Sequence, residues 1–169
     1  MTSEYSPQRR ADQRTRKHPP VATVVDVFTF KMNRFVQINE REGHRWSEEL
    51  FDLTLNEWRV LALIKACAPV RAAHIAELLL MDKSQLSRLI KTLTTKLLIK
   101  SAPDIGDARA IVLRPTRAGD DLYSDMMTEV IRQNEMLLVP LSSEEIVQFN
   151  EMLDRLIKHS LLLLSNPVG

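Results

Sequence analysis

The sequence is short of the residues that build several classes of protein. Its 169 residues include a single cysteine, Cys67, which excludes an internal disulfide and a cysteine-rich zinc site. Four glycines and eight prolines are too few for a collagen-like, low-complexity or turn-rich all-β chain. Aromatic residues make up only 5%, but 44% of the residues are hydrophobic, which suffices for the core of one ordinary domain.

Long apolar runs are also missing. No stretch approaches the ~18 consecutive apolar residues of a membrane helix. The first twelve residues lack the apolar segment of a signal peptide. Together with the single cysteine, these features predict a cytoplasmic protein without a membrane partner.

Residues able to carry catalysis or bind metal are scattered along the chain. Cys67 and His74 are the one thiol and histidine pair to consider, but a cysteine among Ile64, Ala66 and Ala68 is typical of a small buried residue. The four histidines, His18, His44, His74 and His159, lack the spacing of metal ligands. We therefore expect no catalytic residues, no enzyme activity, no metal and no cofactor.

Positive charge is concentrated in one segment, although the whole chain carries a formal net charge of only +1. The net charge is +3 over residues 1–18, −2 over 19–82, +6 over 83–117 and −6 over 118–169. A basic segment of this kind can meet a polyanion while the acidic remainder faces elsewhere. The alternative is a solvated basic face that binds nothing.

The hydrophobic periodicity predicts a mainly helical chain. We expect a flexible basic arm over 1–18, a helix from about Pro20 to Asn39 closed by Gly43, and a connection over 42–53. A capping box, Thr54-Leu55-Asn56-Glu57, starts a helix that ends at Cys67. Two further helices follow from about Arg117 to Leu138 and, after a second capping box at Ser142, to the C-terminal region.

The segment from about Ala72 to Lys96 has the pattern of a helix-turn-helix. Two helices are joined by a corner at Met81–Ser84, with Asp82 as the N-cap of the second. In that second helix the apolar residues Leu86, Leu89, Ile90, Leu93 and Leu97 recur at helical spacing. The outward residues are short, polar or basic, which suits contact with base edges and phosphates in a major groove: Lys83, Ser84, Gln85, Ser87, Arg88 and Lys91.

A β-hairpin is expected next, with strands 99–101 and 110–113 around a polar tip. A hairpin directly after a recognition helix is a wing, and Arg109 beside its tip suits a narrow minor groove, with Asp107 to orient it. The alternative is that Asp107 and Arg109 form a surface ion pair.

The first and last helices are too apolar to remain in water, above all the run Leu161 to Leu164. We expect them to pack together and against a second copy of the chain, as a two-fold dimer. The alternative is an intramolecular core. The predicted dimerisation residues are Val24, Phe28, Phe35, Leu153, Leu156, Ile157 and Leu161.

Residues 53–123 resemble the MarR family of bacterial winged helix-turn-helix regulators. The resemblance rests on the segments 53–61, 75–79 and 82–90, and on the wing motif Asp107-Ala108-Arg109 followed by Thr116 and Gly119. It implies a winged helix-turn-helix domain over 54–117, flanked by dimerisation helices in 19–53 and 118–169. The sequence departs from the family pattern at Leu80, Leu97, Pro115 and Arg71. A left-handed Leu97 would cost ~1–2 kcal/mol, so we expect a reshaped helix end there.

The resemblance further implies a homodimeric transcriptional regulator, expected to be a repressor, that binds a palindromic operator in double-stranded DNA. It also implies release by a small, often aromatic effector. His44 with Trp46 and Trp58 with Arg59 are the aromatic and cationic candidates for that ligand, with core Trp and solvated Arg as the alternative for each pair. The alternative function is a nonspecific architectural DNA-binding protein or a winged-helix module that binds another protein.

Overall fold

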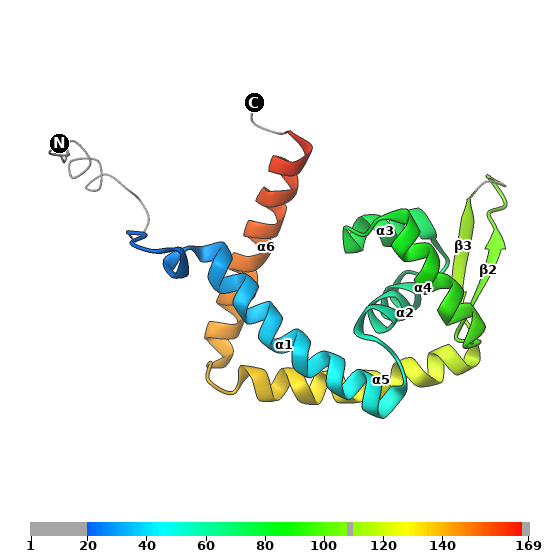
Figure 1. The fold of residues 1–169 in the computed structure, drawn as a ribbon, viewed down its shortest axis with the longest axis horizontal. Coiled ribbons are helices and arrows are strands. Elements are labelled where there is room, and N and C mark those ends of the chain that lie inside the picture. Colours follow the sequence, from blue (N-terminus) through cyan, green and yellow to red (C-terminus); the bar gives the residue numbers. More distant parts are fainter. Residues whose placement is uncertain (1–19, 108–109, 167–169) are drawn as a thin grey trace, which may run out of the picture. The chain divides into compact units, whose positions relative to one another are not determined.

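The computed structural model describes residues 20–107 and 110–166 (Figure 1). The expected mainly helical fold with a small β-wing is confirmed. The chain divides into two compact units, one ending at Asn56 and the other beginning at Glu57. The elements are η2 (Val24–Asp26), α1 (Phe28–Phe51), α2 (Leu55–Cys67), β1 (Val70–Arg71), α3 (Ala72–Leu79), α4 (Lys83–Thr95), β2 (Ile99–Pro103), β3 (Ile111–Pro115), α5 (Arg117–Leu138) and α6 (Ser143–Ser165).

The start of the first unit differs from the expected single helix. Val24 belongs to the short 3-10 helix η2, and Val27 has an extended backbone, so α1 begins only at Phe28. The Asp26 carboxylate accepts bonds from the Thr23 backbone N–H and hydroxyl, at 2.8 and 3.0 Å, which closes this local turn. Three β-branched valines within four residues also disfavour a continuous helix.

The predicted connection over 42–53 was wrong, because α1 continues through Gly43 to Phe51. Gly43 is buried in the helix, where a Cβ would lie 3.4 Å from the methyl carbons of Leu55. The buried Ser47 hydroxyl donates to the Leu53 carbonyl at 2.7 Å, and Asp52 ends the helix in a left-handed conformation. One glycine is a weak helix breaker, and this packing outweighs it.

The core of the second unit is built on α2, whose start and end agree with the sequence prediction. Val60, Leu61 and Ile64 are fully buried, and the Trp58 ring packs on Tyr123 of α5 with centroids 5.5 Å apart. Two ion pairs tie α2 to later elements. Lys65 Nζ lies 2.7 Å from Asp120 Oδ1, and the carboxylate of the buried Glu57 lies 3.5 Å from Lys96 Nζ.

The helix-turn-helix consists of α3 and α4, and the wing follows directly after α4 (Figure 1). Asp82 caps α4 as predicted, since its Oδ1 accepts the Gln85 backbone N–H at 2.8 Å. The wing is a three-stranded antiparallel sheet in the order β1-β3-β2, and its third strand, β1, was not anticipated from the sequence. Pro115 ends β3 in register with Ile99, at a strand end where proline is tolerated.

The expectation of a reshaped end after α4 was wrong. Leu97 keeps the left-handed backbone, with φ 58°, and its side chain is 72% exposed instead of belonging to the buried stripe. Leu80, at the end of α3, has φ 50° and is equally exposed. The left-handed geometry lets the Leu98 N–H reach the Leu93 carbonyl at 2.9 Å, which closes the end of α4.

Replacement of Leu97 by glycine is expected to stabilise the protein by about 0.5–1 kcal/mol. A left-handed conformation disfavours any residue with a Cβ by roughly 1–2 kcal/mol, and the exposed side chain contributes little burial that would be lost. Urea unfolding followed by circular dichroism measures the change. Thr95→Gly, at a right-handed position two residues earlier, is the control and should destabilise by about 0.5–1 kcal/mol. Equal destabilisation by both variants would contradict this account.

The wing joins α5 through a close backbone contact. The Thr116 hydroxyl donates to the Leu97 and Leu98 carbonyls at 2.6 and 3.2 Å, and it accepts the Gly119 N–H at 3.1 Å as the N-cap of α5. Gly119 is buried, and a Cβ at this position would lie 2.0 Å from the Leu98 carbonyl oxygen. Glycine is therefore required where α5 crosses the segment between α4 and β2.

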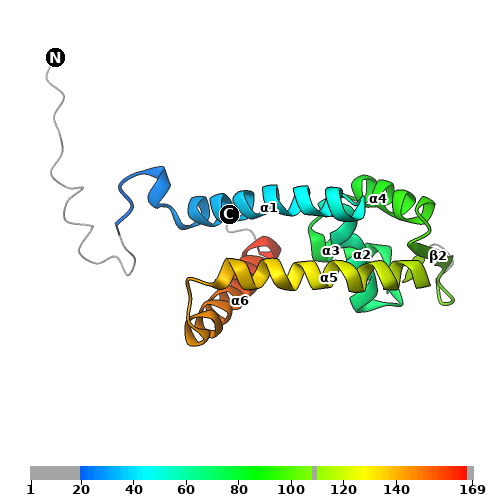
Figure 2. The same ribbon diagram turned by 90° about the horizontal axis from the view of Figure 1, so that it is seen from below.

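Helices α5 and α6 are joined by a short turn (Figure 2). The predicted capping box at Ser142 is confirmed, with Ser142 and Glu145 each accepting the other's backbone N–H. On α5, the Glu129 carboxylate accepts three bonds, two from Arg132 at 2.6 and 2.8 Å and one from Gln133 at 2.7 Å. The Arg132 guanidinium, followed by the Gln133 amide, lowers the pKa of Glu129 from 4.5 to about 2.

Glu129 is expected to make the free energy of unfolding depend on pH between about 4.5 and 2. Because its pKa is lower in the folded chain, its contribution is complete above pH 4.5 and disappears as pH falls toward 2. Urea unfolding at pH 7, 4.5 and 3 should show a shallower acid loss in Glu129→Gln than in the unmutated chain. Glu135→Gln, exposed on the same helix, is the control. Identical acid losses in all three proteins would contradict the role of Glu129.

Candidate nucleic-acid interface

One face of α4 carries polar and basic side chains and no acid. The six residues singled out from the sequence are all exposed: Lys83, Ser84, Gln85, Ser87, Arg88 and Lys91. Leu86 and Leu93 on the other face are buried. Because the helix repeats every 3.6 residues, all six polar side chains lie on its solvent-facing side. There their hydrogen-bond donors and acceptors can contact another molecule.

The outer face of the wing adds positive charge that the sequence prediction missed. Lys100 of β2 and Arg114 of β3 are directly opposite in the strand register, and both are exposed. Like charges at such a cross-strand position repel each other, and a bound anion relieves that repulsion. The alternation of β2 and β3, with Ile99 and Leu113 buried, was the available signal.

The wing turn is tied to the start of α3 by an ion pair that the sequence did not reveal. Arg71 Nε and Nη2 donate to the two carboxylate oxygens of Asp104, each at 3.1 Å. Hydrogen bonding from Arg71 lowers the pKa of Asp104, and the same bond raises the pKa of Arg71. Arg71 is the N-cap residue of α3, but its side chain makes no cap bond. Asp107 lies at the end of the same turn, and Arg109 falls outside the described residues.

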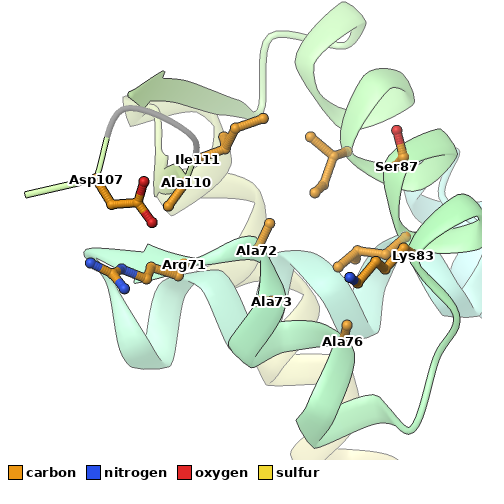
Figure 3. A pocket seen from close by; sticks show the side chains of 11 residues that line it. Arg71, Ala72, Ala73, Ala76, Lys83, Ser87, Asp107, Ala110 and Ile111 are labelled. Atoms are coloured by element: carbon orange, nitrogen blue, oxygen red, sulfur yellow. The ribbon is translucent and has the colours of Figure 1, made fainter. Parts of the chain in front are cut away.

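A cavity of about 410 Å³ lies between the helix-turn-helix and the wing (Figure 3). Its apolar lining includes Ala72, Ala76 and Ile111, from α3 and β3. Figure 3 shows Arg71 and Asp107 on one side and Lys83 and Ser87 of α4 on the other. Helix α4 and the wing turn therefore face each other across this space.

A comparison with known protein families finds a match for one part of the chain. Residues 51–110, which contain α2, the helix-turn-helix and most of the wing, match the model of the MarR family. This region is similar to the MarR family. No curated protein matches the chain.

Several solved structures share the fold of most of this chain. A crystal structure of MarR is 17% identical, covers 88% of this chain and 99% of its own, and has a TM-score of 0.74. The MepR–DNA complex from S. aureus is 21% identical over 79% of this chain and 97% of its own, with a TM-score of 0.71. The PcaV regulator from Streptomyces coelicolor, in complex with its natural ligand, is 19% identical over 83% and 99%, with a TM-score of 0.68.

The four residues suggested as effector contacts lie on two helices. His44 and Trp46 are on α1, where the Trp46 ring meets Phe51 edge to face at 6.2 Å. On α2, Trp58 is 7% exposed and packs on Tyr123, while Arg59 is half-buried. None of the four lines the cavity beside the wing.

The predicted dimerisation residues are accessible in the single chain. Leu153 is half-buried, and the other six are exposed: Val24, Phe28, Phe35, Leu156, Ile157 and Leu161. Between residues 57 and 110 the large exposed apolar side chains are Leu78, the two left-handed leucines and Ile105 at the wing turn. Most of the other exposed apolar side chains lie on η2, α1, the second half of α5, the turn after it and α6.

The remaining polar and sulfur-containing candidates have ordinary surroundings. Cys67 is a free, half-buried thiol at the end of α2, and His74 Nδ1 lies 3.7 Å from Glu77 on its own helix. No three histidine, cysteine or acidic residues among 20–107 and 110–166 gather as a metal site would require. None of the helices described is both long enough and apolar enough to cross a membrane.

Proposed function

We propose that the protein is a sequence-specific DNA-binding transcriptional regulator that acts as a homodimer on a palindromic operator. The observation that carries the proposal is the exposed, acid-free face of α4 within a region similar to the MarR family. A helix presenting serine, glutamine, arginine and lysine fits a major groove, where its early residues reach base edges. The solved complex of the similar MepR with DNA supports this use of the fold.

In this proposal Gln85 and Arg88 read bases, while Lys83, Lys91, Lys100 and Arg114 contact phosphates. Ser84 and Ser87 supply short hydrogen-bonding contacts to bases or phosphates. Arg109 enters the minor groove beside the wing and Asp107 supports it, as the family resemblance implies. In this proposal the contacts to bases make binding sequence-specific, and the contacts to phosphates make the affinity depend on salt concentration.

The apolar surfaces of α1 and α6 support the homodimer. Several phenylalanine and leucine side chains on these helices are exposed to water, which is energetically unfavourable: Phe28, Phe35, Leu156 and Leu161. In the proposed dimer the second copy covers them. A two-fold dimer presents two α4 helices to the two halves of a palindrome. The acidic 118–169 segment then lies away from the DNA.

We further propose that the regulator is a repressor released by a small effector, of the aromatic class that the family resemblance implies. The support is the family resemblance and the similar PcaV, solved with its natural ligand. His44, Trp46, Trp58 and Arg59 stay the candidate contacts for such a ligand. Screening aromatic acids for release of bound DNA tests this part separately.

The deciding experiment is a gel-shift titration with the DNA upstream of the protein's own gene and a random duplex of equal length, at fixed salt. A preference of about tenfold or more, with one dimer per site, is expected. Equal binding to both duplexes, weakening in parallel as salt rises, would instead support a nonspecific architectural protein. No DNA binding at low salt would support the protein-interaction alternative.

Arg88→Ala is expected to reduce the preference for the operator by about fivefold or more while changing random-duplex binding little. A bidentate arginine to a guanine edge is worth about 1–3 kcal/mol of discrimination. Gel-shift titrations with both duplexes measure the ratio. Arg41→Ala, which removes an exposed positive charge on α1, is the control. Equal losses on both duplexes would count against base reading by Arg88.

A further inference from the structure

The ion pair between Arg71 and Asp104 joins two parts of the domain that are 33 residues apart in sequence. Arg71 is the last residue of β1, in register with Val112 of β3, and it immediately precedes α3. Its guanidinium reaches the Asp104 carboxylate with two parallel bonds, the geometry that gives arginine pairs directional specificity.

Asp104 also organises the wing turn. Its Oδ1 accepts the backbone N–H groups of Gly106 and Asp107, at 2.8 and 3.1 Å, in addition to one Arg71 bond. The Asp104 N–H donates to the Ala110 carbonyl at 2.9 Å, and the Ala110 N–H donates to the Asp107 carbonyl at 2.8 Å. The Asp104 side chain is 17% exposed, against 53% for Arg71. The Asp104 carboxylate therefore holds the turn and receives both bonds from Arg71, whose guanidinium also interacts electrostatically with Asp107.

The ion pair between Arg71 and Asp104 lies beside the cavity shown in Figure 3, which separates the wing turn from α4. Arg71 and Asp107 line the wing side of the cavity, and Lys83 and Ser87 of α4 line the opposite side. The rest of the lining between them is small or apolar. Movement of the turn would change its distance from α4, and in the proposed function DNA contacts both.

We propose that Arg71 is a positioning residue for DNA binding, which acts through Asp104 to hold the wing turn at a fixed place relative to the recognition helix. The inference rests on the proposed function for its DNA part. The competing role for an arginine at the start of α3 is a direct contact with a phosphate. In that role Asp104 would restrain Arg71, and its loss would help binding.

The first arm of the test needs no DNA. Hydrogen exchange of the Gly106 and Asp107 amides is measured in the unmutated chain, Arg71→Ala, Arg71→Lys and Asp104→Asn. Asp104→Asn keeps an oxygen acceptor for the turn and removes the charge that pairs with Arg71. Arg71→Ala and Asp104→Asn should both speed exchange by about threefold to fivefold, as expected for loss of a surface pair. The exchange rate in Arg71→Lys should lie between those of the unmutated chain and Arg71→Ala, because lysine keeps the positive charge but cannot donate two parallel hydrogen bonds.

The second arm is a double-mutant cycle in DNA affinity, with Arg71→Ala, Asp104→Asn and the combined variant. The probes are the duplex from upstream of the gene and the random duplex at low salt. Each single variant should weaken binding about threefold to tenfold, and the combined variant should be no weaker than either, since the two act as one unit. Urea unfolding midpoints should stay unchanged, which separates positioning from loss of folding.

The outcomes distinguish the two ideas. Unchanged amide exchange in Arg71→Ala would overturn the positioning role, whatever happens with DNA. Weaker binding by Arg71→Ala with equal or tighter binding by Asp104→Asn would also overturn it and assign Arg71 to a phosphate, with the salt slope reduced by about one. Failure of the unmutated chain to bind any DNA would overturn the proposed function, while the exchange arm would still report whether Arg71 holds the turn.

Discussion

Gly119→Ala is expected to destabilise the protein by about 3 kcal/mol. An alanine Cβ would lie 2.0 Å from the Leu98 carbonyl oxygen and 3.0 Å from its carbon, and both are backbone atoms that cannot rotate away. Relief would require α5 to separate from the segment between α4 and β2, which would break the bonds of Thr116 to the Leu97 and Leu98 carbonyls. Urea unfolding followed by circular dichroism measures the loss.

Gly43→Ala is the matched control, because it makes the same change at another buried helical glycine. There the new Cβ would lie 3.4 Å from the methyl carbons of Leu55, an ordinary van der Waals distance to a side chain that can adjust. Alanine favours helix over glycine by about 0.5–1 kcal/mol, so this variant should be as stable as the unmutated chain or more so. Similar losses in the two variants would show that the backbone contact at Leu98 is not the cause.

Two aspartates on α6, Leu156→Asp with Leu161→Asp, are expected to convert the proposed dimer to monomers and to lower operator affinity by about 100-fold or more. Both leucines are exposed in the single chain, and burying a charge in their place at a subunit interface is strongly unfavourable. A monomer binds only one half-site. It therefore loses the increase in affinity that comes from binding two half-sites at once, a factor of about 10² to 10⁴. Light scattering during gel filtration gives the oligomeric state, and gel shift gives the affinity.

The control for this variant adds the same charge to α6 without removing apolar surface, through Gln148→Asp with Asn150→Asp. Both residues are exposed on the same helix. This variant should remain dimeric and bind the operator nearly as tightly as the unmutated chain. A leucine variant that stays dimeric would remove α6 from the proposed interface, and equal loss in the control would show that the charge alone is responsible.

Local signals in the sequence predicted much of the candidate DNA-binding region. Asp82 and Ser142 were identified as N-caps because a side-chain oxygen and a nearby amide are all that a cap requires. The period of Leu86 and Leu93 predicted which face of α4 is polar, and that face is exposed. The candidate site on α4 could be found in this way because a helix fixes the directions of its own side chains.

The elements that the sequence did not predict depend on partners far along the chain. Gly43 stays helical because Leu55 packs against it, and β1 forms only because β3 lies beside it. Leu97 is left-handed although a Cβ disfavours this, since the closing bond from Leu98 to Leu93 and the contacts of Thr116 hold the helix end. No local pattern pairs Arg71 with Asp104.

The sequence by itself determined the helical class, the starts of α2 to α6, the polar face of α4 and the apolar character of the terminal helices. These follow from propensity, capping and periodicity, which act over a few residues. Only the tertiary structure decided where α1 ends, which glycine is irreplaceable, how Leu97 is held and which arginine fixes the wing turn. Each of these depends on a contact between distant segments, and its energy exists only once the chain has folded.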